Sequence, residues 1–131
     1  DKGVQVIGID LSWHMLSQVF KNSRLHLLQA DIRSLPIRSD QIDHLLSISA
    51  FNFITSGSKT LNASTQNIDR AFAQIARILR YAARCVIEFY PSKIEQPLFL
   101  QSAKTSHFSG GLWIDNPHSK HEKIFLLLRK T

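Results

Sequence analysis

Residues 6–12 of the chain read Val6-Ile7-Gly8-Ile9-Asp10-Leu11-Ser12, an apolar, β-branched run that ends in an acid and a hydroxyl residue. The alternation from Val4 to Ile9 predicts a strand. Ser12 can cap a helix whose apolar positions would be Trp13, Leu16, Val19 and Phe20. A strand, a turn and a helix, with an acid at the carboxyl end of the strand, is the repeating unit of open α/β sheets.

The rest of the chain continues this alternation of strands and helices. The run from Ile42 to Ile48 is mostly apolar at consecutive positions, as expected for a strand that is covered on both faces. The pattern also predicts strands at Leu25 to Ala30, Arg84 to Tyr90, Leu112 to Asp115 and Glu122 to Arg129, a loop at Thr55 to Asn67, a helix from Ile68, and a helix at Ile94 to Ser106. This order predicts an α/β fold with an open sheet and an antiparallel end.

Composition limits the function classes. With 131 residues, 44% hydrophobic and 20% charged, the chain should form one domain with a core. The formal charge of +6 suits an anionic partner such as nucleic acid, or simply a basic protein. The lone Cys85 excludes a disulfide framework and a cysteine zinc site within the chain. Its apolar stretches fall short of the ~20 residues of a membrane helix, so we expect no membrane partner.

Two acids follow neighbouring predicted strands. Asp10 can accept hydrogen bonds from the two hydroxyls of a ribose, and Asp31 can accept one from the exocyclic amine of an adenine. The alternative for each is a structural role, because aspartate often caps the turn or helix that follows it.

Several motifs carry a resemblance to a known family. The early part resembles class I S-adenosylmethionine-dependent methyltransferases in residues 6–12, Met15-Leu16, Gln29-Ala30-Asp31, Leu35-Pro36 and residues 41–44. The later part is similar to the eukaryotic enzymes that methylate guanine N7 in small-subunit (18S) ribosomal RNA, in residues 47–50, residues 88–91, residues 108–112, Asp115-Asn116-Pro117 and Ser119. The resemblance spans nearly the whole chain and implies a Rossmann-like methyltransferase fold with an antiparallel last strand.

The resemblance implies a cofactor site for S-adenosylmethionine. Asp10, beside Leu11, would hold the ribose, Asp31 and the Ile32 backbone would hold the adenine, and Ser49 would lie near the methionine end. No catalytic side chain is assigned, because guanine N7 carries a free lone pair at neutral pH and positioning should dominate.

The substrate side would lie after two further strands. Phe51, Phe53 and Tyr90, with Pro91 next to the last, are candidates to stack on a base, and Asn52 to read its edge. The alternative for Phe51 and Phe53 is packing in the core. Here the family pattern differs, since Asn52-Phe53 stands where a Gln-Trp pair is typical and His107 where a small glycine is expected.

The start of the chain also differs from the family. Asp1-Lys2-Gly3 corresponds to the segment before the second strand of the fold, so we expect a domain over residues 1–131 that lacks the first strand and its glycine-rich turn. The resemblance further implies two partners, small-subunit ribosomal RNA and a small zinc-binding activator protein, and a location in the nucleus, nucleolus and cytoplasm.

Other readings remain open. The chain could be a non-catalytic pre-ribosome scaffold or RNA-binding paralogue, or a small-molecule methyltransferase. We expect no metal site, because His118 and His121 lie in a solvated turn near Asp115. A phosphate-binding surface could be built from five arginines, which are Arg33, Arg38, Arg77, Arg80 and Arg84.

Overall fold

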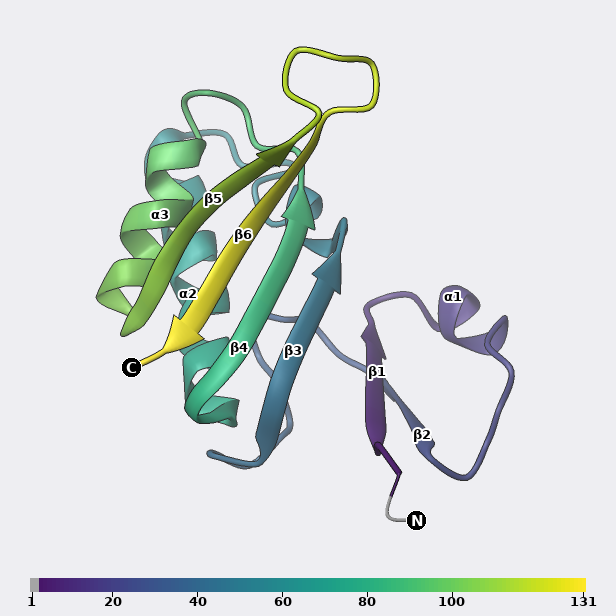
Figure 1. The fold of residues 1–131 in the computed structure, drawn as a ribbon. Coiled ribbons are helices and arrows are strands. Elements are labelled where there is room, and N and C mark those ends of the chain that lie inside the picture. Colours follow the sequence, from purple (N-terminus) through teal and green to yellow (C-terminus); the bar gives the residue numbers. More distant parts are fainter. Residues whose placement is uncertain (1–2) are drawn as a thin grey trace.

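The computed structural model describes residues 3–131; Asp1 and Lys2, on which part of the comparison at the start of the chain rests, lie outside them. Strands and helices alternate as the sequence predicts (Figure 1). The elements are β1 (Val6–Asp10), α1 (Trp13–Ser17), β2 (Leu25–Gln29), β3 (Ile42–Ile48), the 3-10 helix η1 (Ala50–Phe53), α2 (Leu61–Ile78), β4 (Leu79–Phe89), α3 (Gln96–Thr105), β5 (Phe108–Asp115) and β6 (Lys123–Lys130).

The strands form two sheets rather than one. β1 and β2 pair in parallel, and a four-stranded sheet has the order β3-β4-β6-β5. In the larger sheet β3 and β4 are parallel, whereas β6 runs antiparallel to both of its neighbours, β4 and β5. The predicted α/β class and the antiparallel end are therefore confirmed, with the sheet divided between β1 and β3.

The core lies between the larger sheet and the helices α2 and α3, which cover the same face of that sheet (Figure 1). A cluster of phenylalanine rings forms the centre of the core. In its closest pair, Phe89 and Phe99, the ring centroids are 4.9 Å apart and the ring planes meet at 75°. Such edge-to-face contacts add to the large apolar area that each ring removes from water. The cluster fixes the ends of β3 and β4 against α2 and α3.

Several boundaries differ from the sequence prediction, and β4 begins at Leu79, five residues before the predicted start at Arg84. α2 begins at Leu61, inside the predicted loop, because the Thr60 hydroxyl accepts a hydrogen bond from the Ala63 N–H and caps the helix. β5 runs through Gly110-Gly111, which we predicted to break the chain before the strand. α1 ends at Ser17, and within α1 only Leu16 of the predicted apolar stripe is buried, since Trp13 is 62% exposed. Phe20, beyond the helix, is 94% exposed.

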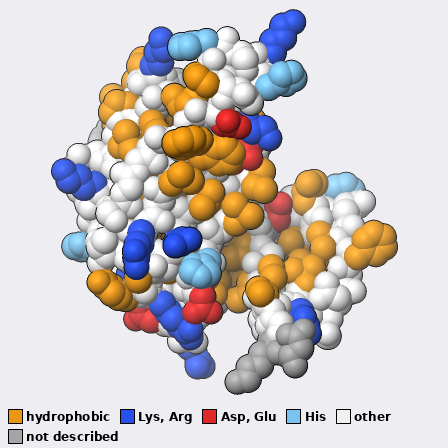
Figure 2. Space-filling model, in the orientation of Figure 1, with side chains coloured by type: hydrophobic (Ala, Val, Ile, Leu, Met, Phe, Trp, Pro, Cys, Tyr) orange, Lys and Arg blue, Asp and Glu red, His pale blue; other side chains and the backbone are white. Residues whose placement is uncertain are grey.

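A hollow separates the two sheets. Among the described strands, β1 pairs with β2 alone and β3 with β4 alone, so each has one edge without a strand partner. The space beside them has a volume of about 480 Å³, and apolar side chains such as Ile7, Leu28 and Ile42 line it. Figure 2 shows this hollow as a deep notch between the two parts of the molecule. Within residues 3–131, no helix is long and apolar enough to span a membrane.

Candidate functional site

Asp10 and Asp31 lie at the carboxyl ends of two paired strands. Asp10 is the last residue of β1, and its carbonyl accepts a hydrogen bond of 3.2 Å from the N–H of Ala30, directly after β2. The two acids are therefore brought to one edge, as predicted. The Asp10 carboxylate accepts one hydrogen bond, 2.8 Å from the Ser12 N–H. Asp10 thus also has the structural role that the sequence left open, since it holds the turn into α1.

Leu11 and Ile32 follow the two acids. The Leu11 side chain is exposed, and its carbonyl accepts a hydrogen bond from the Gln29 amide at 3.1 Å. This bond joins the turn after β1 to the end of β2. Ile32 is half-buried against the core beyond β2.

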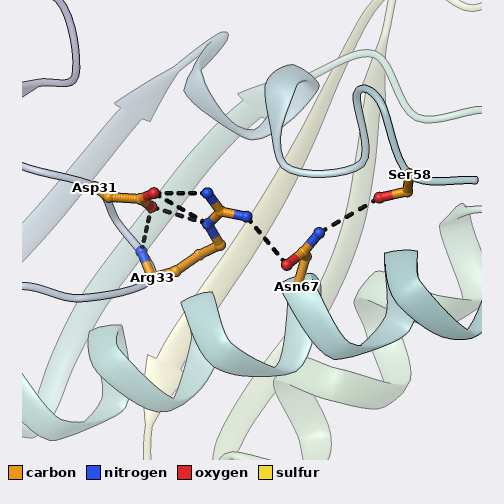
Figure 3. A network of polar contacts seen from close by, with 4 residues as sticks. All are labelled: Asp31, Arg33, Ser58 and Asn67. Atoms are coloured by element: carbon orange, nitrogen blue, oxygen red, sulfur yellow. Dashed lines mark hydrogen bonds and ion pairs between the residues drawn. The ribbon is translucent and has the colours of Figure 1, made fainter.

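The Asp31 carboxylate is held by Arg33 in a polar network (Figure 3). Its shortest contact is 2.7 Å, to Arg33 Nη2, and the Arg33 backbone N–H donates to the same carboxylate at 2.9 Å. These hydrogen bonds hold the pKa of Asp31 below its usual range, against the opposing effect of partial burial. The guanidinium also donates to Asn67 of α2, at 3.1 Å.

The ends of β3 and β4 are tied together at the predicted substrate side. Ser49 has a left-handed backbone, with φ of 63°, and its N–H donates to the Glu88 carbonyl at 2.9 Å. This sharp change of direction starts η1. The Asn52 side chain then accepts a hydrogen bond of 2.7 Å from the Tyr90 backbone N–H. Ser49, Asn52 and Tyr90 are therefore brought together at one edge, as predicted.

The aromatic candidates separate into two groups. Phe53 is 74% exposed and Tyr90 is 55% exposed, so both rings are available to a ligand. Phe51 is 1% exposed and packs on the rings of Phe72 and Phe99. The expectation that Phe51 stacks on a base is therefore corrected: its ring lies in the core, because η1 turns it inward. Phe51 therefore packs in the core, the alternative that the sequence also allowed.

Sequence reasoning missed a polar cluster beside this edge. Glu95 accepts hydrogen bonds from the Thr55 hydroxyl at 2.6 Å and from the Ser92 N–H at 3.0 Å, while the Ser92 hydroxyl accepts one from the Glu95 N–H. The Thr55 hydrogen bond is the main cause that lowers the pKa of Glu95. Thr55 and Glu95 of this cluster, with Asn52 and Pro91, line a small cavity of about 30 Å³. The spacing Ser92-x-x-Glu95 is a capping-box pattern that could have revealed it.

The predicted arginine surface is largely engaged within the protein. Arg33 pairs with Asp31, Arg80 with Asp43 at 2.6 Å, and Arg77 donates to main-chain carbonyls before β3. Arg38 and Arg84 remain exposed. In the part of the chain that the structure describes, no three His, Cys, Asp or Glu side chains are grouped as metal ligands.

Comparison with known proteins gives a consistent match. Residues 1–87 match the family model described as a methyltransferase domain. The chain is 36% identical to the Arabidopsis thaliana 18S rRNA (guanine-N(7))-methyltransferase RID2, over 98% of this chain and 46% of that protein. It is 29% identical to the Schizosaccharomyces pombe 18S rRNA (guanine-N(7))-methyltransferase bud23, over 97% of this chain and 49% of that protein. The chain thus spans about half the length of the curated relatives it matches.

Solved structures share the fold. One is a Listeria monocytogenes S-adenosylmethionine-dependent methyltransferase, with a TM-score of 0.71 and 13% identity over 97% of this chain and 80% of that chain. Another is a Haloferax volcanii methyltransferase in complex with the Trm112 activator, with a TM-score of 0.66 and 14% identity over 96% of this chain and 71% of that chain. At these identities the similarity concerns the fold.

Proposed function

The chain belongs to the methyltransferase domain family, and from that premise we propose that it acts in S-adenosylmethionine-dependent methylation of guanine N7 in small-subunit ribosomal RNA. The observation that carries this proposal is the meeting of Asp10 and Asp31 at adjacent strand ends, in a chain 36% identical to an enzyme of that name. The substrate itself rests on the names of the relatives.

The acids fit the cofactor chemically. The carboxylate of Asp10 accepts one hydrogen bond and has acceptor positions left for ribose hydroxyls. Asp31 is about one third exposed, and its carboxylate oxygens can accept a hydrogen bond from the adenine amine. Ser49, at the end of β3, would lie toward the methionine part. When bound, the cofactor supplies an activated methyl group.

The chain's own residues would then position the base. Guanine N7 already holds a lone pair, so no side chain has to remove a proton before transfer. Phe53 and Tyr90 offer exposed rings on which a base can stack, and Asn52 is fixed between them by its hydrogen bond to the Tyr90 N–H. Orientation of this kind can supply about 7–11 kcal/mol of the barrier in favourable cases.

We propose that a further strand lies in the hollow between β1 and β3. Protein outside residues 3–131 would supply it, together with the glycine-rich turn that approaches the cofactor. The support is that β1 and β3 run in the same direction in Figure 1 and have strand edges without a strand partner beside an apolar hollow. Such edges leave backbone N–H and C=O groups that pair readily with another strand.

We also propose that the protein binds a small zinc-binding activator. We further propose that it acts in the nucleus, nucleolus and cytoplasm, where small ribosomal subunits are made. Support for the activator is the similar fold of the Haloferax methyltransferase solved with Trm112. The exposed apolar side chains of Trp13, Met15 and Phe20 are also surfaces that a partner would cover.

Calorimetric titration and RNA methylation test the proposal together. S-adenosylmethionine should bind the chain when it is extended by the segment that supplies the further strand and the glycine-rich turn and is coexpressed with the activator. In this extended form Asp10→Asn and Asp31→Asn should each weaken binding. Methyl transfer to 18S ribosomal RNA should appear at guanine N7. Asp69→Asn, on an exposed face of α2, is the matched control and should bind as the wild type does. Cofactor binding without RNA methylation would favour a small-molecule methyltransferase, and RNA binding without cofactor binding would favour the scaffold.

A further inference from the structure

The hydrogen bonds that hold Asp31 leave only part of its carboxylate free. Oδ1 accepts from the Arg33 backbone N–H at 2.9 Å and from Nε at 3.0 Å, and Oδ2 accepts from Nη2 at 2.7 Å with a weaker share of Nε at 3.2 Å. A carboxylate offers about four acceptor positions. Three N–H groups of Arg33 therefore fill about three of them, and about one remains.

The pair of Asp31 and Arg33 is accessible to a ligand and is held by hydrogen bonds on both sides. The side chains of Asp31 and Arg33 are 32% and 33% exposed, so a ligand can reach the carboxylate. On its other side the guanidinium donates to Asn67 of α2, whose amide donates in turn to the Ser58 hydroxyl at 3.4 Å (Figure 3). Arg33 is thus fixed from two directions, by the end of β2 and by the long helix.

We propose that Arg33 is a positioning residue of the adenosine site: it holds the Asp31 carboxylate in one orientation, with a single acceptor position open for a ligand N–H. This role rests on the proposed function, because it takes Asp31 as the acceptor for the adenine amine. An adenine amine donates one N–H to such a site, and therefore needs no displacement of the guanidinium.

The expected effect follows from the contacts that remain without the guanidinium. In Arg33→Met the Asp31 carboxylate keeps one hydrogen bond, from the backbone N–H of residue 33. Without the guanidinium, the Asp31 side chain is free to rotate. A ligand would then have to order the side chain as it binds. Ordering one side chain costs enough to weaken binding about fivefold.

The experiment titrates S-adenosylhomocysteine and its N6,N6-dimethyl analogue into the activator-bound protein that includes the further strand and the glycine-rich turn proposed above. Wild type should prefer the unmodified ligand, and Arg33→Met should bind it about fivefold more weakly and lose most of that preference. Arg70→Met is the control, because Arg70 acts on Asp31 through charge without a hydrogen bond to it. It should leave the preference intact. A pH titration of the Asp31 carboxyl group, followed by carbon-13 NMR without ligand, is the last measurement. Its midpoint should shift in Arg33→Met.

The outcomes separate the two proposals. Equal or tighter binding by Arg33→Met would overturn the positioning role and leave the cofactor site in place. An unchanged Asp31 titration would also overturn it, since Arg33 would then not hold the carboxylate in solution. If no form binds S-adenosylhomocysteine although the titration moves as expected, the proposed cofactor site itself fails and the role of Arg33 fails with it.

Discussion

The Asn52 side-chain oxygen accepts a 2.7 Å hydrogen bond from the backbone N–H of Tyr90, and this contact joins the carboxyl ends of β3 and β4. In Asn52→Ala the Tyr90 N–H loses its protein partner, and we expect a loss of about 0.5–1.5 kcal/mol in the free energy of unfolding. Urea denaturation measures it. Asn52→Asp keeps an acceptor oxygen and should lose less; equal losses in the two variants would mean that the hydrogen bond does not stabilise the fold.

Phe51 and Phe53 form a matched pair with opposite surroundings. Phe51→Ala removes a buried ring that contacts Phe72 and Phe99, and should lower the free energy of unfolding by about 3–5 kcal/mol. Phe53→Ala changes an exposed side chain and should stay within about 0.5 kcal/mol.

Of the two residues, Phe53 is the one whose loss should affect RNA binding. Phe53→Ala should weaken binding of single-stranded ribosomal RNA, because loss of one stacked base costs about 1–3 kcal/mol. Fluorescence anisotropy with a labelled 18S fragment measures this. If Phe53→Ala retains full RNA affinity, Phe53 has no role in stacking, and Tyr90 becomes the remaining exposed aromatic candidate.

The two glycines of β5 give a second matched pair. Gly110 has φ of +132°, and a Cβ there would lie 1.9 Å from the Leu127 carbonyl oxygen, whereas a Cβ at Gly111 would meet nothing within 4 Å. Gly110→Ala should therefore destabilise the protein strongly and Gly111→Ala only slightly. Thermal unfolding followed by circular dichroism compares them. Similar melting temperatures for the two variants would be incompatible with this register of β5 and β6.

The carboxyl ends of the strands agree with the sequence prediction to about one residue, whereas the starts of β4, β5 and α2 do not. β3 was predicted at its observed limits because consecutive apolar residues mark a covered strand. The start of α2 was missed because residues 61–67 are polar, and the Thr60 cap is one hydroxyl among several. The Gly110-Gly111 pair predicts a break before β5, whereas pairing with β6 carries the strand through both residues.

The sequence predicts where the site residues lie in the fold, but it does not predict which of their side chains contact one another. Asp10 and Asp31 follow neighbouring strands, so their meeting could be expected from topology. The bond between Asp31 and Arg33 depends on how the turn after β2 folds, which no periodicity reveals. Likewise, alternation along residues 51–53 does not decide which ring enters the core, because η1 rather than a strand sets their directions.

Cys85 should be unreactive in the folded protein. It lies buried in β4, and burial raises the pKa of its thiol to about 12, so almost no thiolate exists at pH 8. Iodoacetamide should therefore leave the native chain unmodified and should alkylate it rapidly in 6 M urea, a concentration chosen for the test to unfold it, as mass spectrometry would detect. Rapid alkylation without denaturant would show that β4 opens locally and would contradict the buried position.

Glu95 should make stability depend on pH. The Thr55 hydrogen bond lowers the folded-state pKa of Glu95 below its ordinary value of 4.5. A carboxyl group with a lowered folded-state pKa stabilises the fold fully above its unfolded pKa, and this contribution is lost as the pH falls through the folded pKa. Urea midpoints should therefore show Glu95→Gln less stable than wild type at pH 7, with the difference shrinking below about pH 4. Thr55→Val, which removes the main cause of the shift, should reduce the same pH dependence. A difference between Glu95→Gln and wild type that stays constant from pH 7 to pH 3 would mean that Glu95 contributes through packing and not through its charge.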